Sequence, residues 1–221
     1  MKETTRTIAS YDASASAFAQ RWFDYRLEEA VHRFASRLPA GALILDVGCG
    51  VGRDVQHLSE LGFAALGIDL STGMLAEARR RVKATFIQAD MRRLPFASGC
   101  FDALWICASL FHLPKTEAPH VLEECRRVLD RGHLFLAVRR GKGERWMADL
   151  DKGRARFFAY YQPSEIKNLA EKAGLQIVDA WQNPPGPGQS EPWLHLIAAC
   201  HADTRPFPVD RTQRLWYNSR K

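Results

Sequence analysis

Three acidic residues stand near the ends of apolar segments, where they could bind a polar small molecule. Asp46 lies in the segment 42–47, and the glycine-rich run Gly48-Cys49-Gly50-Val51-Gly52 follows it directly. Glycines let the backbone turn tightly and let a ligand approach it closely. Asp69 follows 19 residues after Gly50, and a carboxylate there can accept hydrogen bonds from two ribose hydroxyls. Asp90 can accept one from an adenine amino group, and Met91 can cover the adenine ring.

Two other interpretations compete with a nucleoside site. An isolated acid at a strand end is usually a helix cap or a solvated loop residue, but three such acids in register reverse that expectation. A dinucleotide site needs a third glycine at the position that Arg53 occupies. Asp46 also suits an amine-bearing or cationic ligand better than a diphosphate.

Apolar runs alternate with helical segments along most of the chain. We predict strands at 42–47, 63–68, 85–89, 101–107 and 133–138, and helices at 12–37, 52–61, 71–82, 115–129 and 163–173, with Ser71 as an N-cap. This alternation indicates a parallel sheet covered on both faces. Two further strands at 175–180 and 193–200 flank a loop that begins Asn183-Pro184-Pro185, and we expect them to form an antiparallel last pair.

Four ordered motifs together resemble the class I S-adenosylmethionine-dependent methyltransferase family, in particular its small-molecule branch. They are LDVGCGVG at 45–52, GIDLS at 67–71, QADM at 88–91 and FDALWICASLFHL at 101–113. The resemblance covers roughly residues 10–200. It implies an α/β, Rossmann-like three-layer sandwich with a seven-stranded, mostly parallel sheet, an antiparallel last strand and an N-terminal helical lid.

The resemblance also implies S-adenosyl-L-methionine as the cofactor and a set of residues that contact it. Tyr11 and Arg21 correspond to lid residues that could hold its methionine carboxylate, and Arg53 could serve the same group or be a solvated first-turn residue. The full predicted set is Tyr11, Arg21, Asp46, Gly48, Cys49, Gly50, Arg53, Asp69, Leu70, Met74, Asp90, Met91 and Cys107.

The expected reaction is in-line transfer of a methyl group to an oxygen or nitrogen atom of a small-molecule acceptor. The sulfonium already activates the methyl group, so the protein mainly aligns the acceptor and excludes water. His112 is a candidate general base, although a structural histidine bonded to a carbonyl is the alternative. Trp146, Tyr160 and Tyr161 are candidate acceptor-binding walls or core residues. We predict no metal ligands.

An RNA-directed enzyme, or an RNA-associated cofactor-binding protein, is the alternative function. Residues 203–221 contain five basic and two acidic residues and therefore hold half of the net charge of +6, so a basic tail could touch RNA. The rest of the chain is only mildly basic. The position after 101–107 lacks the Asp/Asn-Pro-Pro-aromatic motif of amino-directed nucleic-acid enzymes, and Asn183-Pro184-Pro185-Gly186 lacks the aromatic residue. A nucleic-acid partner is therefore less favoured.

Composition places the chain among cytoplasmic proteins of one main domain. No apolar run is long enough to cross a bilayer, and the N-terminus lacks a secretory pattern. The five cysteines lack disulfide or metal spacing. We expect a domain at 1–202, made of a lid at 1–40, a cofactor-binding half at 41–140 and a substrate-side half at 141–202, followed by a basic tail at 203–221. Oligomeric state and the identity of the acceptor stay open.

Overall fold

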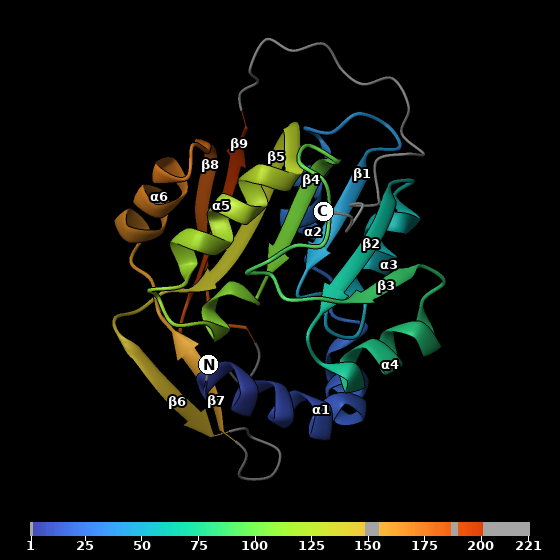
Figure 1. Ribbon diagram of the computed structural model, residues 1–221, viewed down its shortest axis with the longest axis vertical. Helices are drawn as coiled ribbons and strands as arrows, with labels where there is room; N and C mark the ends of the chain where they lie inside the picture. The colour runs from blue at the N-terminus through green and yellow to red at the C-terminus, as the bar shows by residue number, and fades with distance from the viewer. Residues whose placement is uncertain (1, 149–154, 187–189, 201–221) are drawn as a thin grey trace, which may run out of the picture.

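The computed structural model describes residues 2–148, 155–186 and 190–200. A seven-stranded sheet forms its centre, in the order β3-β2-β1-β4-β5-β9-β8 (Figure 1). Its strands are β1 (Leu43–Val47), β2 (Ala64–Asp69), β3 (Thr85–Gln88), β4 (Phe101–Cys107), β5 (Leu129–Arg139), β8 (Gln176–Asn183) and β9 (Trp193–Ala199). The first five are parallel, and β9 runs antiparallel to both of its neighbours. The predicted α/β sheet and its reversed last strand are confirmed.

Helices cover both faces of this sheet because successive strand residues point to opposite faces. On one face Ile44, Trp105 and Phe135 pack against α2, and on the other Leu45, Leu104 and Leu136 join the core that α5 and α6 complete. The helices are α1 (Lys2–Trp22), α2 (Glu28–Ala35), α3 (Arg53–Glu60), α4 (Thr72–Arg81), α5 (Ala118–Val128) and α6 (Pro163–Lys172), with a 3-10 turn η1 at Leu110–His112.

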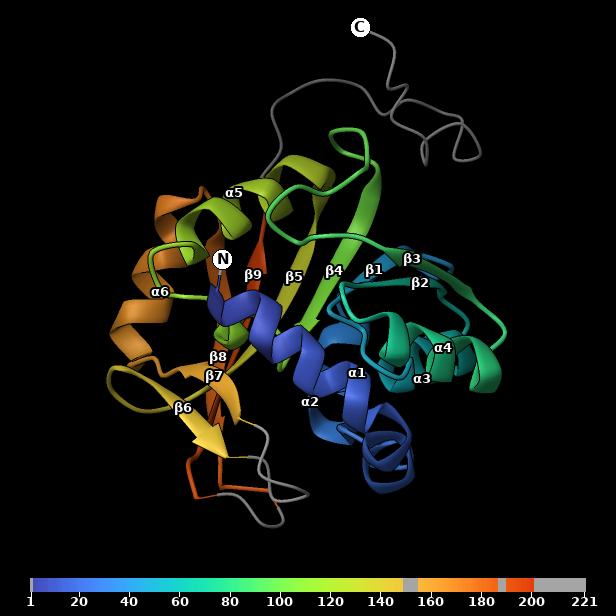
Figure 2. The same cartoon turned by 60° about the horizontal axis from the view of Figure 1, so that its bottom comes forward.

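The N-terminal helical segment differs from the prediction of one helix at 12–37. It consists of two helices with a break after Trp22. The two helices cover different surfaces. In α2, Phe34 packs against Trp105 on one face of the sheet, whereas α1 lies across the carboxyl ends of the strands (Figures 1 and 2). The periodicity of apolar residues indicates that a helix has a buried face, but not which surface that face contacts. The sequence therefore did not predict two separate helices.

A two-stranded hairpin lies beside α1 at the same end of the sheet. It pairs β6 (Glu144–Ala148) with β7 (Ala155–Ala159), and the sequence did not predict it. Most residues of β6 are exposed, so the strand lacks the apolar alternation that a sequence pattern can report. Together, α1 and this hairpin enclose the carboxyl ends of the strands, where open α/β sheets bind their ligands.

Candidate functional site

The glycine-rich turn between β1 and α3 is fixed by close packing. Gly48 has φ +78°, and a Cβ atom there would lie 2.3 Å from the Cβ of Ser109, so no other residue fits without displacing the loop after β4. The backbone amides of Gly48 and Cys49 both donate to the carbonyl of Ile68, at 2.8 and 2.9 Å. The turn is therefore held against β2 and β4 at once.

Asp69, the last residue of β2, ties the glycine turn to the start of α4. Its Oδ2 accepts a hydrogen bond from the amide of Gly50 and its Oδ1 accepts one from the amide of Ser71, both at 2.9 Å. Burial raises the pKa of Asp69, although these backbone hydrogen bonds oppose the rise. Ser71 caps α4 as predicted, since its Oγ accepts from the amide of Met74 at 3.1 Å.

Asp90 follows β3 and forms an ion pair that the sequence analysis did not include. Burial favours a higher pKa for its carboxyl group, but hydrogen bonds from Arg92 outweigh burial and leave the pKa below its usual value. The Nη2 of Arg92 lies 2.6 Å from Oδ2 of Asp90, and its Nη1 donates to Glu117 at 2.8 Å. The carboxylate of Asp90 is thus charged and held in one orientation.

A second ion pair lies at the start of α3. Arg53 donates from Nε and Nη2 to the two carboxylate oxygens of Asp54, both at 2.7 Å, and Trp105 donates to Asp54 at 2.9 Å. Asp46 lies nearby, buried, and its Oδ2 has no hydrogen-bond partner among the described residues. Burial, together with the charge of Asp54, raises the pKa of Asp46 well above its usual value. This group of acids would be stabilised by a ligand that donates hydrogen bonds or carries positive charge.

His112 connects η1 to the lid helix and to the hairpin. Its Nδ1 lies 2.8 Å from the carbonyl oxygen of Phe157, so Nδ1 carries the proton and donates it. The hydroxyl of Tyr11 in α1 then donates to Nε2, at 2.7 Å. Burial, aided by the positive charges of Arg156 and Arg139, lowers the pKa of His112 to about 3. The imidazole is therefore neutral, in one tautomer, with its acceptor nitrogen at the cavity wall.

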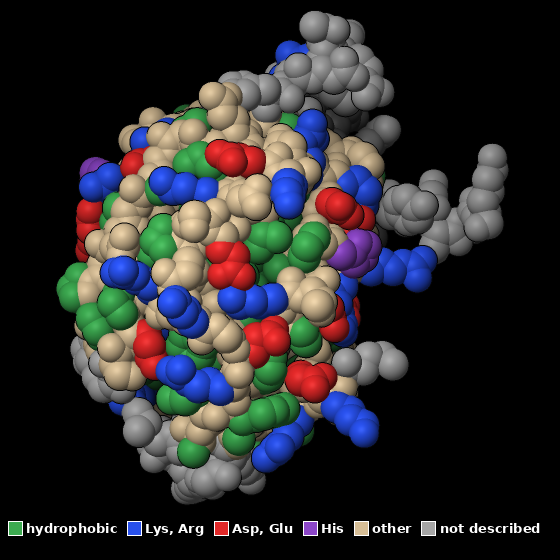
Figure 3. Space-filling view, turned by 90° about the vertical axis from the view of Figure 1, so that its left-hand side faces the viewer, with side chains coloured by type: hydrophobic (Ala, Val, Ile, Leu, Met, Phe, Trp, Pro, Cys, Tyr) green, Lys and Arg blue, Asp and Glu red, His purple; other side chains and the backbone are tan. Residues whose placement is uncertain are grey.

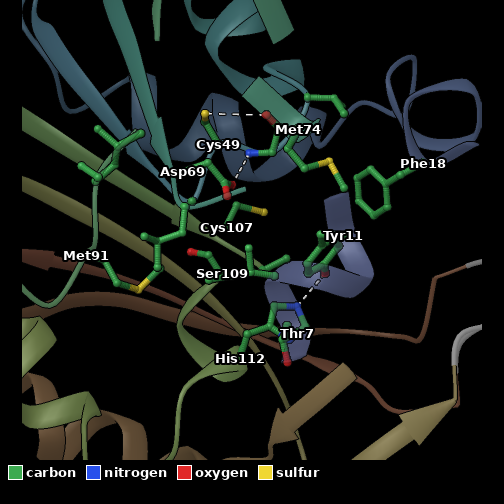
Figure 4. A pocket seen from close by; sticks show the side chains of 18 of the residues that line it. Thr7, Tyr11, Phe18, Cys49, Asp69, Met74, Met91, Cys107, Ser109 and His112 are labelled. Carbon is green, nitrogen blue, oxygen red and sulfur yellow. Dashed lines mark hydrogen bonds between the residues drawn. The ribbon is translucent and has the colours of Figure 1, made fainter. Parts of the chain in front are cut away.

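Most of the predicted cofactor residues line one cavity at the carboxyl ends of β1, β2 and β4 (Figure 4). The helix α1 covers it with Thr7, Tyr11 and Phe18. Asp54 also lines this cavity and was not predicted. The predicted residues that line it are Tyr11, Gly48, Cys49, Gly50, Arg53, Asp69, Leu70, Met74, Asp90, Met91, Cys107 and His112.

Five predicted residues lie outside the lining of this cavity. Arg21 is exposed and its guanidinium stacks on Trp22, 5.1 Å from the ring centroid, because α1 turns this position toward solvent. Asp46 is buried behind the glycine turn. Trp146, in β6, packs on Phe157 of β7 and is 37% exposed, whereas Tyr160 and Tyr161 are core residues. These three aromatic residues also lie outside the adjoining cavity described next.

A second cavity of about 190 Å³ adjoins the first. The two share the wall made by Tyr11, Phe18, Trp22, Arg53, Cys107, Ala108 and His112. The sequence analysis missed two residues that line the second cavity, Arg139 and Arg156. Arg139 is the last residue of β5, one position beyond the predicted strand 133–138, and Arg156 lies in β7 of the unpredicted hairpin. The end of β8 and the loop after it contribute Asn183, Pro184 and Gly186.

The loop between the two cavities carries backbone strain. Ala108, directly after β4, has φ +59°, the one non-glycine residue with positive φ among those the structure describes. A left-handed conformation is unfavourable for alanine and persists where surrounding contacts enforce it, often at functional sites. Here Ser109 donates to the carbonyl of Val47 at 2.6 Å and holds the loop against β1.

Comparisons with known proteins agree with this geometry. Residues 44–132 match the family described as "Methyltransferase domain". The chain is 32% identical to methyltransferase GfsG of Streptomyces halstedii, over 69% of this chain and 62% of GfsG, which is less than two thirds of that protein. It is 29% identical to the ubiquinone biosynthesis O-methyltransferase of Xanthomonas axonopodis pv. citri (strain 306), over 74% of this chain and 79% of the relative.

Solved structures share the fold. The Burkholderia thailandensis 1,6-didemethyltoxoflavin-N1-methyltransferase, solved with 1,6-didemethyltoxoflavin and S-adenosylhomocysteine, superposes with a TM-score of 0.73 at 20% identity. The match covers 90% of this chain and 88% of that one. At this identity the likeness concerns the fold alone.

Proposed function

Because the chain belongs to the class I S-adenosylmethionine-dependent methyltransferase family, we propose that it transfers a methyl group to an oxygen or nitrogen atom of a small molecule. S-Adenosylmethionine is the cofactor. The observation that carries the proposal is the pair of cavities that meet at Tyr11, Cys107 and His112, since one suits a cofactor and the other an acceptor. The names of the relatives include both an O- and an N-methyltransferase.

The residues of the first cavity fit the cofactor chemically. The carboxylates of Asp69 and Asp90 line the cavity and suit two ribose hydroxyls and an adenine amino group. Asp46 lies behind the glycine turn, outside the lining, and its unpartnered Oδ2 adds negative potential that suits an ammonium. Arg53 uses Nε and Nη2 for Asp54, which leaves Nη1 for the carboxylate of the methionine moiety. Met91, Leu70 and Met74 supply apolar contacts. When bound, the cofactor supplies a methyl group activated by a sulfonium.

The chain contributes orientation and a proton acceptor. The acceptor atom gains the methyl group and loses its proton, which we assign to Nε2 of His112 once the acceptor takes the place of the Tyr11 hydroxyl at this nitrogen. The low pKa of His112 makes this nitrogen a weak base in the absence of ligands. Burial raises the pKa of the Cys107 thiol, so this side chain is neutral and contributes shape.

The domain division is part of the same proposal. We assign cofactor binding to 41–140 together with α1, and acceptor binding to the region after 140. The RNA-directed alternative depends on 203–221, which lie outside the described residues. On the face in Figure 3, basic and acidic side chains are intermixed, so this face lacks the charge of a polyanion-binding surface.

The described residues contain no helix that is long and apolar enough to cross a bilayer. Within the same ranges no cluster of three acidic, histidine or cysteine side chains is arranged to hold a metal. The five cysteines are free thiols, and a cytoplasmic location stays part of the proposal.

Calorimetric titration with S-adenosylmethionine tests the cofactor assignment. Asp69→Ala removes both ribose acceptors and the bond to Gly50, so we expect affinity to fall by about tenfold or more. The matched control is Asp24→Ala, an exposed residue between α1 and α2. Equal affinity of Asp69→Ala and wild type would overturn the assignment of Asp69, and absence of binding to the wild type would overturn the proposed function.

A further inference from the structure

The second cavity is positively charged. Arg53, Arg139 and Arg156 line it, and no aspartate or glutamate does so among the residues that the structure describes. Arg53 is neutralised by Asp54, with which it makes two hydrogen bonds. Arg139 and Arg156 enter the same cavity from different strands, β5 and β7.

Arg139 is a buried cation with incomplete partners. Its side chain is 12% exposed, and its guanidinium stacks on Trp193 at 4.3 Å from the ring centroid. Its Nη1 donates to the backbone carbonyl of Glu191 at 3.3 Å, whereas its Nε has no hydrogen-bond partner among the described residues. The carboxylate of Glu191 lies 3.9 Å from Nη1 but only 2.5 Å from Arg145, which does not line the cavity. Glu191 therefore compensates Arg139 only in part.

Arg156 lies close enough to Arg139 for their charges to repel each other. Burial lowers the pKa of Arg139, and the charge of Arg156 lowers it further. The guanidinium of Arg156 stacks on Tyr11 at 4.8 Å and approaches Phe158 at 6.0 Å from the ring centroids. Both arginines also lower the pKa of His112, so all three groups surround the same space. A buried guanidinium with an unpartnered donor, such as Arg139, and a second cation beside it are stabilised by a bound anion.

The remaining wall of the second cavity is aromatic. Phe111 stacks on Phe158, with ring centroids 5.3 Å apart, and Trp193 lies 5.8 Å from Phe111. Phe18, Trp22 and Tyr25 also line this cavity. A cavity of 150 Å³ is enough for benzene, so about 190 Å³ holds a single ring with substituents. Aromatic walls favour a flat ring over a flexible chain.

We propose that the methyl acceptor is a planar aromatic molecule bearing a carboxylate, held by Arg139 and Arg156 with its ring between the aromatic side chains. The proposal rests on the proposed methyltransferase function, because it assigns the second cavity to the acceptor. Guanidinium groups bind a carboxylate through paired hydrogen bonds, and the unpartnered Nε of Arg139 is one donor for such a pair. The ring then lies beside the wall that carries Tyr11 and His112.

Calorimetry with matched acids and amides tests this proposal. The probes are 4-hydroxybenzoate and 4-hydroxybenzamide, and 3,4-dihydroxybenzoate and its carboxamide, titrated with and without saturating S-adenosylhomocysteine. We expect at least one acid to bind about tenfold more tightly than its own amide. Arg139→Gln should remove this preference without changing amide binding, and Arg139→Lys should retain part of it because it keeps the charge. The control is Arg140→Gln, since Arg140 is exposed and bonds Gln182.

Several results would overturn the proposal. They are equal binding of every acid and its amide, absence of binding by all four probes, and an acid preference that survives in Arg139→Gln. Tighter binding of phenyl phosphate than of benzoate would assign the cavity to a phosphate instead. If Arg139→Gln does not fold, the salt dependence of binding to the wild type provides the test. Raising the potassium chloride concentration must lower the affinity for the acids and leave the affinity for the amides unchanged. Failure to bind S-adenosylhomocysteine would instead overturn the proposed function, while binding of it without an acid preference overturns the acceptor class alone.

Discussion

At the scale of single residues, the site combines acids that sequence reasoning can find with cations that it cannot. Asp69 and Asp90 were predictable because an alternating strand and helix pattern places strand ends at one edge of the sheet. Arg139 and Arg156 were not, because their convergence depends on a hairpin without a strong sequence pattern. Tyr160 and Tyr161 were candidates by residue type, but they lie in the core while Arg156 and Phe158 line the cavity.

His112 makes a prediction about stability and pH. Its pKa of about 3 in the folded protein lies below the ordinary 6.5, so the folded state disfavours its proton. The neutral imidazole therefore contributes fully to the free energy of unfolding above pH 6.5. This contribution is lost as pH falls toward 3, at up to about 1.4 kcal/mol per pH unit. His112→Gln should therefore flatten the dependence of the free energy of unfolding on pH, measured by urea titration between pH 6.5 and 4.5.

The control for this measurement is His120→Gln, whose side chain is 63% exposed. His195 keeps its own contribution in both variants, since burial lowers its pKa to about 4. If His112→Gln and wild type lose stability with the same slope, the buried, neutral state described for His112 is wrong.

At the scale of elements, α1 is the part that closes the site. Asp12 attaches it to α4: one carboxylate oxygen accepts from the hydroxyl of Ser71 at 2.6 Å and from the amide of Gly73 at 2.8 Å. Gly73 permits this approach, since a Cβ atom there would lie 2.8 Å from the carbonyl oxygen of Asp12. The resemblance predicted a lid, but its attachment through Asp12 required the structure, because no local pattern pairs positions 12 and 71.

Removing this attachment should loosen the lid and leave the sheet intact. In Asp12→Ala the hydroxyl of Ser71 and the amide of Gly73 lose their acceptor, which costs about 1–3 kcal/mol in the docked state. We expect faster hydrogen exchange in α1 by about tenfold or more, with little change in β4 and β5. Asp24→Ala is again the control, and unchanged protection of α1 in Asp12→Ala would show that other contacts hold the lid.

At the scale of the whole molecule, the sequence predicted the sheet and its cofactor edge better than the surroundings of the acceptor. The parallel strands and the antiparallel last pair follow from alternating elements and from one short final connection, whereas the order of the strands was seen only in the structure. The division of the N-terminal segment into α1 and α2 and the β6–β7 hairpin depend on which distant surfaces they cover. The acceptor cavity lies between these elements, so its cationic and aromatic character could be seen only in the folded chain.

The central claim is that two joined cavities hold a cofactor and an acceptor, and a crystal structure with S-adenosylhomocysteine tests it most directly. The account predicts density along the glycine turn, with ribose at Asp69, adenine beside Asp90 and Met91, and the amino-acid end toward Arg53. The sulfur should face the wall of Tyr11, Cys107 and His112 and leave the cavity of Arg139 and Arg156 open. Density at another place, or a ligand that fills both cavities, would contradict the account.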